Sequence, residues 1–258
     1  MTTIKKVDKN DVRDFWENKV PFFETERSLK DIDLSYLELT DKTHLLYSPF
    51  LNTIRKDLSK KGKTIIEVGC GGGMDSRAFA KLGLDVITLD LNRRSCEVTK
   101  KGYHLLNLQM NVIQADAENL PFRSNCVDIV YSFGTLHHTP DTQKAVHEIY
   151  RIVKHSVFVM LYNKNLSYYA KKIRHNQKTK QEIFNMYDNT VLSKLYNKSE
   201  IRQMFDCFKN INIQSRMFLA AKYSPKKVLH LLLFILHFTG LERLYGSVNL
   251  IWAEKAEN

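Results

Sequence analysis

The chain has 258 residues, of which 43% are hydrophobic and 11% aromatic, and such values are typical of a globular protein that can bury a sizeable core in one domain. Its four cysteines form no Cys-x-x-Cys pair and have no metal-ligand spacing with histidine, so we expect no metal site. No signal peptide is visible in the sequence, and the cysteine usage favours the reduced cytoplasm.

Residues 8–60 are expected to form a helical arm. Apolar residues recur at helical spacing in VRDFWENKV and in THLLYSPFLNTIRKDL, and Lys60-Lys61-Gly62 closes the segment. Because the arm precedes the first expected strand, we expect it to pack over the open edge of the site that follows.

The segment TIIEVGCGGG, residues 64–73, is the most informative stretch of the chain. An apolar, β-branched run ends in Glu67 and then in Gly69, Gly71 and Gly73 at alternate positions. This pattern predicts a buried parallel strand and then a turn with no side chains on its inner face, so that a ligand can lie against the backbone. We interpret Cys70 as a small residue that fits this turn rather than as a nucleophile.

The spacing indicates which kind of cofactor the turn accepts. A dinucleotide fingerprint needs glycine at position 74, which is Met74, and no Gly-Lys-[Ser/Thr] follows for a P-loop. The carboxylate of Glu67 would repel a diphosphate but suits a cation. Asp90 ends the next apolar run, where an acid can accept both hydroxyls of a ribose. A cationic, ribose-bearing cofactor without a diphosphate remains, and S-adenosylmethionine fits.

Strands and helices are expected to alternate from residue 63 to residue 163. The expected strands are TIIEV, DVITL, NVIQA, DIVYSF and VFVMLY, and the expected helices cover residues 75–82, 93–106 and 142–153. Alternation of this kind implies a parallel sheet with helices on both faces. Ligands of such sheets bind beyond the carboxyl ends of the strands, where all these motifs lie.

The motifs resemble those of the class I S-adenosylmethionine-dependent methyltransferases over residues 60–165. EVGCGGG is similar to their first motif, Asp90 to the ribose-binding acid, and Asp116-Ala117 in QADAENLPF to the adenine-edge contact. DIVYSFGTLHHTPD, residues 128–141, resembles the fourth-strand motif of the subgroup that includes the quinone-biosynthesis C-methyltransferases and many small-molecule methyltransferases, and HEIYRIV resembles the helix that follows it.

The resemblance implies an α/β, Rossmann-like fold. Its sheet has seven mostly parallel strands in the order 3-2-1-4-5-7-6, with helices on both faces, an N-terminal helical arm and an insertion after strand 5. SVNLIWAEK near the C-terminus looks like the antiparallel seventh strand. One departure is that Lys154-His155-Ser156 replaces the family's Lys-Pro-Gly-Gly before the fifth strand, which predicts a shorter turn.

We expect a single methyltransferase domain over residues 1–258. Its parts are the arm (1–60), the cofactor-binding core (61–165), a basic substrate-covering insertion with strand 6 (166–227), and an apolar helix with the final strand (228–258).

The resemblance also implies roles for single residues. The cofactor-binding set comprises Glu67, Gly69, Cys70, Gly71, Gly73, Asp90, Leu91, Asp116, Ala117, Ser132 and Phe133. His137 and His138 are candidates for a general base, although the same string also occurs as a turn that caps the next helix through Asp141 or Thr139. Tyr162, Tyr168 and Tyr169 are candidates for the acceptor pocket.

The net charge of +11 is concentrated between residues 151 and 230, which hold sixteen Lys and Arg against four Asp and Glu. Three interpretations compete: a solvated face, a surface for anionic lipid or nucleic acid, and a pocket for an acidic substrate. The apolar run from Val228 to Phe238 is too short to span a bilayer. It is either a buried helix or an interfacial helix, which would place the cytoplasmic protein at an anionic membrane surface.

The sequence thus predicts an enzyme that transfers a methyl group from S-adenosylmethionine to an oxygen, nitrogen or carbon atom. Because no RNA-binding module is visible, a small-molecule or lipid- or sugar-linked acceptor is favoured over RNA. RNA is the alternative acceptor. A non-catalytic, cofactor-binding partner subunit is a further alternative, and an oxidoreductase is disfavoured by the glycine spacing.

Overall fold

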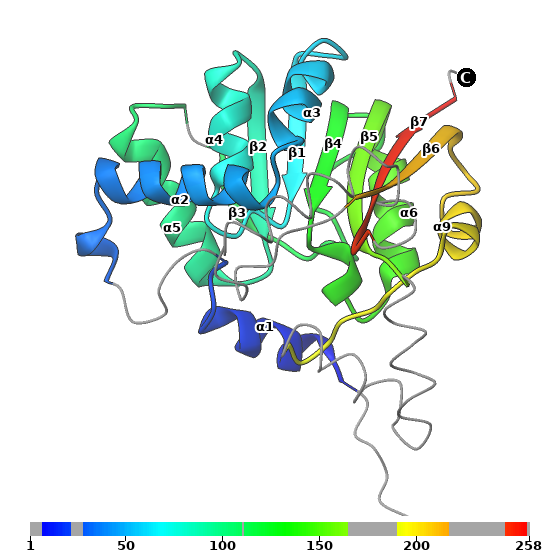
Figure 1. The fold of residues 1–258 in the computed structure, drawn as a ribbon, viewed down its shortest axis with the longest axis horizontal. Coiled ribbons are helices and arrows are strands. Elements are labelled where there is room, and N and C mark those ends of the chain that lie inside the picture. Colours follow the sequence, from blue (N-terminus) through cyan, green and yellow to red (C-terminus); the bar gives the residue numbers. More distant parts are fainter. Residues whose placement is uncertain (1–6, 22–27, 110, 165–189, 217–245, 257–258) are drawn as a thin grey trace, which may run out of the picture.

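The computed structural model describes residues 7–21, 28–109, 111–164, 190–216 and 246–256. They form a seven-stranded sheet with the order β3-β2-β1-β4-β5-β7-β6 (Figure 1). The strands are β1 (Thr64–Val68), β2 (Asp85–Asp90), β3 (Val112–Gln114), β4 (Val127–Phe133), β5 (Val153–Tyr162), β6 (Lys209–Arg216) and β7 (Val248–Glu254). Strands β1 to β5 pair in parallel, and β7 is antiparallel to both β5 and β6. The predicted fold class and strand order are therefore confirmed.

Helices cover both faces of this sheet. They are α1 (Lys9–Glu17), α2 (Leu34–Tyr47), α3 (Leu51–Leu58), α4 (Met74–Lys81), α5 (Arg93–Leu105), α6 (Thr142–Ile152) and α9 (Lys198–Met204), with the 3₁₀ helices η1 (Leu29–Asp31) and η2 (Leu136–His138). Asn92 caps α5, where its side chain accepts from the Ser95 amide, and Asp141 caps α6, where it accepts from the Lys144 amide.

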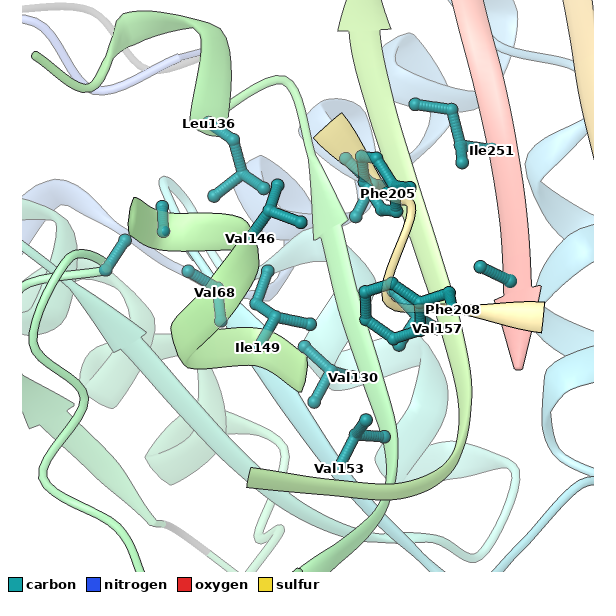
Figure 2. Close-up of a cluster of buried hydrophobic side chains, with 14 of the residues drawn as sticks. Val68, Val130, Leu136, Val146, Ile149, Val153, Val157, Phe205, Phe208 and Ile251 are labelled. Atoms are coloured by element: carbon teal, nitrogen blue, oxygen red, sulfur yellow. The ribbon is translucent and has the colours of Figure 1, made fainter. Parts of the chain in front are cut away.

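Two hydrophobic cores follow from the alternation of side chains along the strands. Ile66 and Val157 belong to the face that packs against α6 and α9, and Figure 2 shows part of this core. Their neighbours Ile65 and Phe158 point to the opposite face, where they pack with α3 and α4. Both faces are covered by helices, which is why apolar residues occupy consecutive rather than alternate positions in much of the central strands, as in Ile65-Ile66 of β1 and Ile129-Val130 of β4.

The start of β5 differs from the prediction. Lys154, His155 and Ser156 do not form a turn, because α6 ends at Ile152 and β5 begins at Val153. Val153 is fully buried, so the strand must start there, whereas Lys154 and His155 are exposed. In the ladder, Val127 pairs with Val153 and Ile129 with Ser156, so the exposed residues are accommodated by a register shift.

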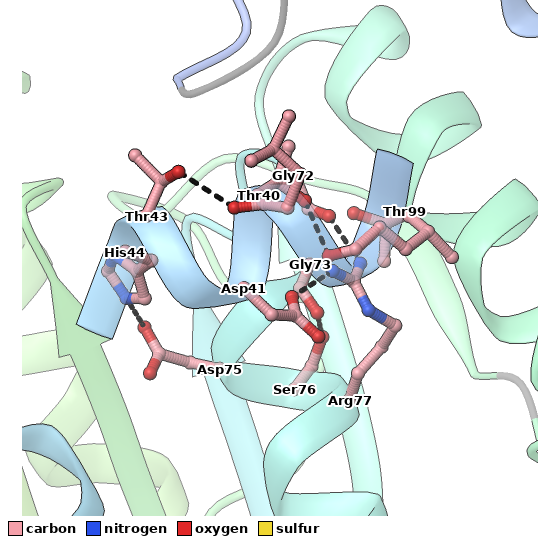
Figure 3. A network of polar contacts seen from close by, with 12 residues as sticks. Thr40, Asp41, Thr43, His44, Gly72, Gly73, Asp75, Ser76, Arg77 and Thr99 are labelled. Carbon is pink, nitrogen blue, oxygen red and sulfur yellow. Dashed lines mark hydrogen bonds and ion pairs between the residues drawn. The ribbon is translucent and has the colours of Figure 1, made fainter. Parts of the chain in front are cut away.

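The arm of residues 8–60 contains helices, as predicted, and packs on α4 and α5. Its main anchor is Asp75, a buried acid in the first turn of α4. The side chain of Arg55, from α3, donates to Asp75 through Nε at 2.8 Å and through Nη2 at 2.5 Å. Nε2 of His44, from α2, lies 3.1 Å from the other carboxylate oxygen, as Figure 3 shows.

A second ion pair joins α2 to α4. Nη2 of the fully buried Arg77 lies 2.5 Å from Asp41, and its Nη1 donates to the carbonyl oxygen of Gly72 at 2.6 Å (Figure 3). Arg77 therefore connects the arm directly to the glycine turn.

Within the described ranges, no helix combines the length and apolar character needed to cross a bilayer. The run from Val228 to Phe238, and most of the predicted insertion, lie outside the described residues.

The substitution Asp75→Asn tests the anchor of the arm. We expect it to lower the free energy of unfolding by about 3 kcal/mol, because Arg55 would keep a buried charge without its counterion. Urea denaturation at neutral pH measures this change. The matched control is Asp57→Asn on α3, whose side chain is exposed and meets Lys60 only at 3.5 Å. It should cost about 0.5 kcal/mol or less, and equal losses in the two variants would contradict the prediction.

Candidate functional site

The turn after β1 needs its glycines for two separate reasons. Gly69, Gly71 and Gly73 all have positive φ, at 85°, 49° and 73°. A Cβ at Gly69 would also lie 2.0 Å from Oγ1 of Thr135, and one at Gly73 would lie 2.7 Å from Thr99. No side chain fits at these two positions, because Thr135 and Thr99 pack directly against the turn there.

Asp90, at the end of β2, is bound to this turn. Its carboxylate accepts from the Gly71 amide at 3.0 Å and from the backbone and side-chain nitrogens of Asn92 at 3.1 and 3.0 Å. Burial raises the pKa of Asp90 from 3.8 to about 6, although these hydrogen bonds oppose the rise. Leu91 follows Asp90 and is half-buried.

Glu67, the last acid before the turn, is buried beneath it. Thr88 on β2 donates its hydroxyl to the carboxylate at 2.8 Å. Burial, together with the nearby negative charge of Asp75, raises the pKa of Glu67 from 4.5 to about 8. Glu67 is therefore largely protonated at neutral pH.

Asp75 has the opposite tendency in the same region. Burial alone would raise its pKa, but the charges and hydrogen bonds of Arg55 and His44 outweigh burial and hold the pKa below its usual range. The negative charge in this region thus resides on Asp75, where a buried guanidinium compensates it.

Cys70 lies in the turn and is buried. Thr99 donates its hydroxyl to the sulfur at 3.4 Å, and burial raises the pKa of the thiol well above its usual value. A buried, protonated thiol is a poor nucleophile, which agrees with the interpretation of Cys70 as a small packing residue.

The loop after β3 carries Asp116 and the buried Ala117. Asp116 accepts from the Glu118 amide at 2.9 Å, and its other oxygen lies 2.5 Å from Nζ of Lys9 on α1. Lys9 also lies 3.0 Å from Glu118. Lys9 is not predictable from the sequence, because nothing in the local pattern of α1 marks it as a partner of this loop.

Helix α1 is also fixed at its other end, where Glu17 accepts from the Arg93 amide at 3.0 Å. Arg93 begins α5, directly after the end of β2. The arm therefore spans from the loop after β3 to the loop after β2, over the carboxyl edge of the sheet. Pro21 follows and would contact a Cβ on Gly71 at 3.5 Å.

Ser132 and Phe133 end β4. The hydroxyl of Ser132 donates to the carbonyl oxygen of Val68 at 2.9 Å, so it holds β4 to β1 at the entrance of the turn. The half-buried ring of Phe133 meets His44 edge-on, with ring centroids 5.7 Å apart.

His137 and His138 lie in η2, and the structure gives them different surroundings. His137 is fully buried, its ring lies 3.9 Å from that of Tyr162, and neither ring nitrogen makes a well-formed hydrogen bond within the described part of the chain. Burial, aided by the adjacent His138, moves the pKa of His137 well below its usual value.

His138 is buried but bonded. Its Nδ1 lies 2.6 Å from the carbonyl oxygen of Leu192 and 3.1 Å from Oγ of Ser193. Trp16 of α1 meets its ring edge-on, with centroids 5.1 Å apart, and Tyr162 does so at 5.8 Å. Tyr168 and Tyr169 lie outside the described residues.

The structure thus brings the turn, Asp90, Asp116 and the two histidines to one edge of the sheet, with the arm across it. Where it is described, the chain has no cluster of three or more histidine, cysteine or acidic side chains that could hold a metal ion. The missed residues His44, Arg55 and Lys9 come from the arm, twenty or more residues from the acids that they bind.

Comparisons with known proteins agree with this geometry. Residues 66–161 match the family model described as Methyltransferase domain. A ubiquinone biosynthesis O-methyltransferase of Coxiella burnetii is 30% identical over 128 residues, which are 49% of this chain and 55% of that protein. The chain therefore matches only about half the length of this curated relative.

Solved structures show the same fold at low identity. A magnesium protoporphyrin IX methyltransferase from Synechocystis PCC 6803 with bound S-adenosylhomocysteine has a TM-score of 0.62 and 14% identity, over 96% of this chain and 100% of that one. A [4+2]-cyclase has a TM-score of 0.61 and 12% identity, over 97% of each chain. The fold alone therefore does not define the reaction.

Residues 66–161 are therefore similar to the Methyltransferase domain family, and the sheet has the fold of the solved methyltransferase structures. The curated relative shares this part of the chain and is named as a ubiquinone biosynthesis O-methyltransferase.

Gly69→Ala and Gly83→Ala form a matched pair that separates space from backbone strain. Both glycines have a φ of 85°, but a Cβ at Gly83 would meet nothing within 4 Å. We expect Gly83→Ala to lower the free energy of unfolding by about 1 kcal/mol and to leave the affinity for S-adenosylmethionine unchanged. Gly69→Ala should cost about 2–4 kcal/mol and weaken that affinity at least tenfold, because Thr135 must shift. Urea denaturation and calorimetry measure the two effects, and equal affinities would contradict the prediction.

A pH series with Glu67→Gln tests the buried acid. The folded protein retains the proton of Glu67 up to about pH 8, whereas the unfolded chain releases it near 4.5. The stability that this group contributes is therefore lost as the pH rises between these values. The stability that Asp90 contributes is also lost as the pH rises, between its ordinary pKa of 3.8 and its raised pKa of about 6.

Urea midpoints measured between pH 5 and pH 8 should consequently fall more steeply in the wild type than in Glu67→Gln. The control Glu38→Gln, on the exposed face of α2, should follow the wild type. Parallel curves for the wild type and Glu67→Gln would show that Glu67 is ionised throughout.

Proposed function

We propose that this protein is a methyltransferase that binds S-adenosylmethionine in the glycine turn and methylates a small-molecule acceptor. The observation that carries the proposal is the turn from Gly69 to Gly73, whose three glycines have positive φ, with the half-buried carboxylate of Asp90 held against it. Thr135 and Thr99 leave no room for a Cβ at Gly69 or Gly73, so these glycines let the turn pack closely on the protein's own side chains. The proposed cofactor would lie against the backbone of this turn, next to Asp90.

The proposed cofactor contacts follow the positions of the side chains. Asp90 accepts the ribose hydroxyls, Leu91 and Ala117 lie against the adenine, and Asp116 accepts from its amino group through oxygens that Lys9 and the Glu118 amide already orient. Glu67 acts through the turn rather than by direct contact, because it is buried beneath it and bonded to Thr88. Cys70 and Ser132 shape the turn, and Phe133 covers the methionine end.

Bound S-adenosylmethionine supplies a methyl group on a positively charged sulfur. The protein must hold the acceptor in line with this group and keep water away. Helix α1 supports the second task, because Lys9 and Glu17 fix it across the carboxyl edge of the sheet.

An oxygen acceptor is favoured, and His138 is the proposed general base. Its Nδ1 is bonded to Leu192, which leaves Nε2 as the basic nitrogen of the neutral ring. His137 is less suited to the role, because burial moves its pKa far down and its ring packs on Tyr162. We therefore propose that His137 and Tyr162 line the acceptor pocket. The curated relative from Coxiella burnetii is named as an O-methyltransferase, which agrees with this acceptor type.

The first experiment identifies the acceptor. The purified protein is incubated with methyl-labelled S-adenosylmethionine and a cell extract, which is then separated into small-molecule, lipid and RNA fractions. We expect label in the small-molecule or lipid fraction. Label in RNA that disappears steeply with rising salt would instead support the RNA alternative. Cofactor binding without transfer to any fraction, restored by a partner protein, would support the non-catalytic alternative.

His138→Ala tests the base in the labelled fraction. We expect turnover to fall by a factor of about 100 or more, with the affinity for S-adenosylmethionine within about twofold of the wild type. His155→Ala is the control, because His155 is exposed at the opposite end of β5. Unchanged turnover in His138→Ala would remove the base from the mechanism and leave cofactor binding intact.

Peripheral contact with an anionic membrane remains a prediction from the sequence. Flotation with anionic vesicles tests it, and Leu232→Asp with Phe234→Asp should abolish the flotation if the apolar run is interfacial.

A further inference from the structure

The residues that follow the undescribed range 165–189 return to the proposed site. The Tyr196 amide donates to the carbonyl oxygen of Tyr162 at 2.9 Å, and the Lys194 amide donates to that of His137 at 3.0 Å. The segment 190–196 therefore lies against both the end of β5 and η2. The side chains of three residues in this loop, Thr190, Leu192 and Ser193, are buried there, and two of them are polar.

Two oxygen atoms of this segment approach one nitrogen of His138. The carbonyl oxygen of Leu192 lies 2.6 Å from Nδ1, and Oγ of Ser193 lies 3.1 Å from it. A carbonyl oxygen can only accept, so a contact this short requires the proton to be on Nδ1. In the neutral ring, Nε2 then carries the lone pair.

The hydroxyl groups complete a consistent chain. Nδ1–H of His138 donates to both the Leu192 carbonyl oxygen and Oγ of Ser193. The Ser193 hydroxyl therefore accepts a hydrogen bond from the ring. Its own proton is then available to Thr190, whose Oγ1 lies 2.6 Å away. Ser193 and Thr190 are thus oriented by each other, and Ser193 is oriented toward the ring.

The ring has little room to rotate. Trp16 and Tyr162 meet it edge-on, with centroid distances of 5.1 and 5.8 Å, and the ring of His137 lies 4.2 Å away. These neighbours come from α1, β5 and η2, so three elements hold the plane of the ring while the segment 190–193 selects the nitrogen that bears the proton.

We propose that Ser193 and Thr190 are positioning residues, which together with the Leu192 carbonyl fix His138 as the Nδ1–H tautomer, so that Nε2 carries the basic lone pair. The expected effect on turnover rests on the proposed function, whereas the expected tautomer of His138 does not. The chain after the insertion would then complete the site by setting the tautomer of a histidine more than fifty residues earlier in the sequence.

Nitrogen-15 NMR of histidine-labelled protein tests the tautomer without any turnover. The chain has nine histidines, and the loss of one signal set in His138→Gln assigns His138. We expect the wild-type protein to carry the proton of neutral His138 on Nδ1, although free histidine prefers Nε2. A wild-type signal for the Nε2–H tautomer would overturn the inference.

Ser193→Ala tests the contribution of the hydroxyl. We expect part of the His138 population to change to the Nε2–H tautomer and turnover in the labelled fraction to fall about threefold to tenfold, with KM unchanged. Ser193→Thr keeps a hydroxyl and should restore both readouts. The matched control is Ser156→Ala, a buried serine at the opposite end of β5, which should alter neither.

An unchanged tautomer and turnover in Ser193→Ala would overturn the role of Ser193. The two proposals fail separately: an active His138→Ala enzyme would refute the general base, whereas a wrong tautomer in the wild type would refute only the positioning.

Discussion

The hydrogen bond from the Gly71 amide to the carboxylate of Asp90 is the contact on which the site depends. It joins the turn after β1 to the end of β2, and Asp90 also accepts from Asn92, the cap of α5. The turn is further bound from below, because Arg77 donates to the carbonyl oxygen of Gly72 and is itself paired with the arm. The glycines allow the backbone of this loop many conformations, and its hydrogen bonds with Asp90 and Arg77 restrict it to one.

Three carboxylates near the turn, the buried Glu67 and Asp75 and the half-buried Asp90, differ in pKa because their surroundings differ. Glu67 has a hydroxyl donor and a negative neighbour, so it holds its proton to about pH 8. Asp75 is ionised and compensated by Arg55, whereas burial raises the pKa of Asp90 to about 6 although backbone amides bind its carboxylate. A carboxylate beside the turn that is ionised at neutral pH can accept hydrogen bonds from hydroxyl groups.

Much of the fold could be predicted from the sequence, because alternating strands and helices leave a strong pattern and the glycine turn has a fixed spacing. The predicted start of β5 was wrong. The prediction assumed a turn like the one in the family, whereas in the structure the strand begins at the buried Val153. His137 and His138 could not be distinguished from sequence, since their difference lies in contacts with Tyr162 and Leu192. Lys9, His44 and Arg55 left no local signal, because their partners are distant in the chain.

The placement of β7 has a consequence for biosynthesis. This strand, residues 248–254, inserts between β5 and β6, and its side chains enter both hydrophobic cores, with Leu250 on one face and Ile251 on the other. Until the ribosome releases these residues, β5 is an open edge and β6 has no neighbour within the sheet. The nascent protein can form the half of the sheet that carries the glycine turn early, but the sheet closes only after β7 has been made.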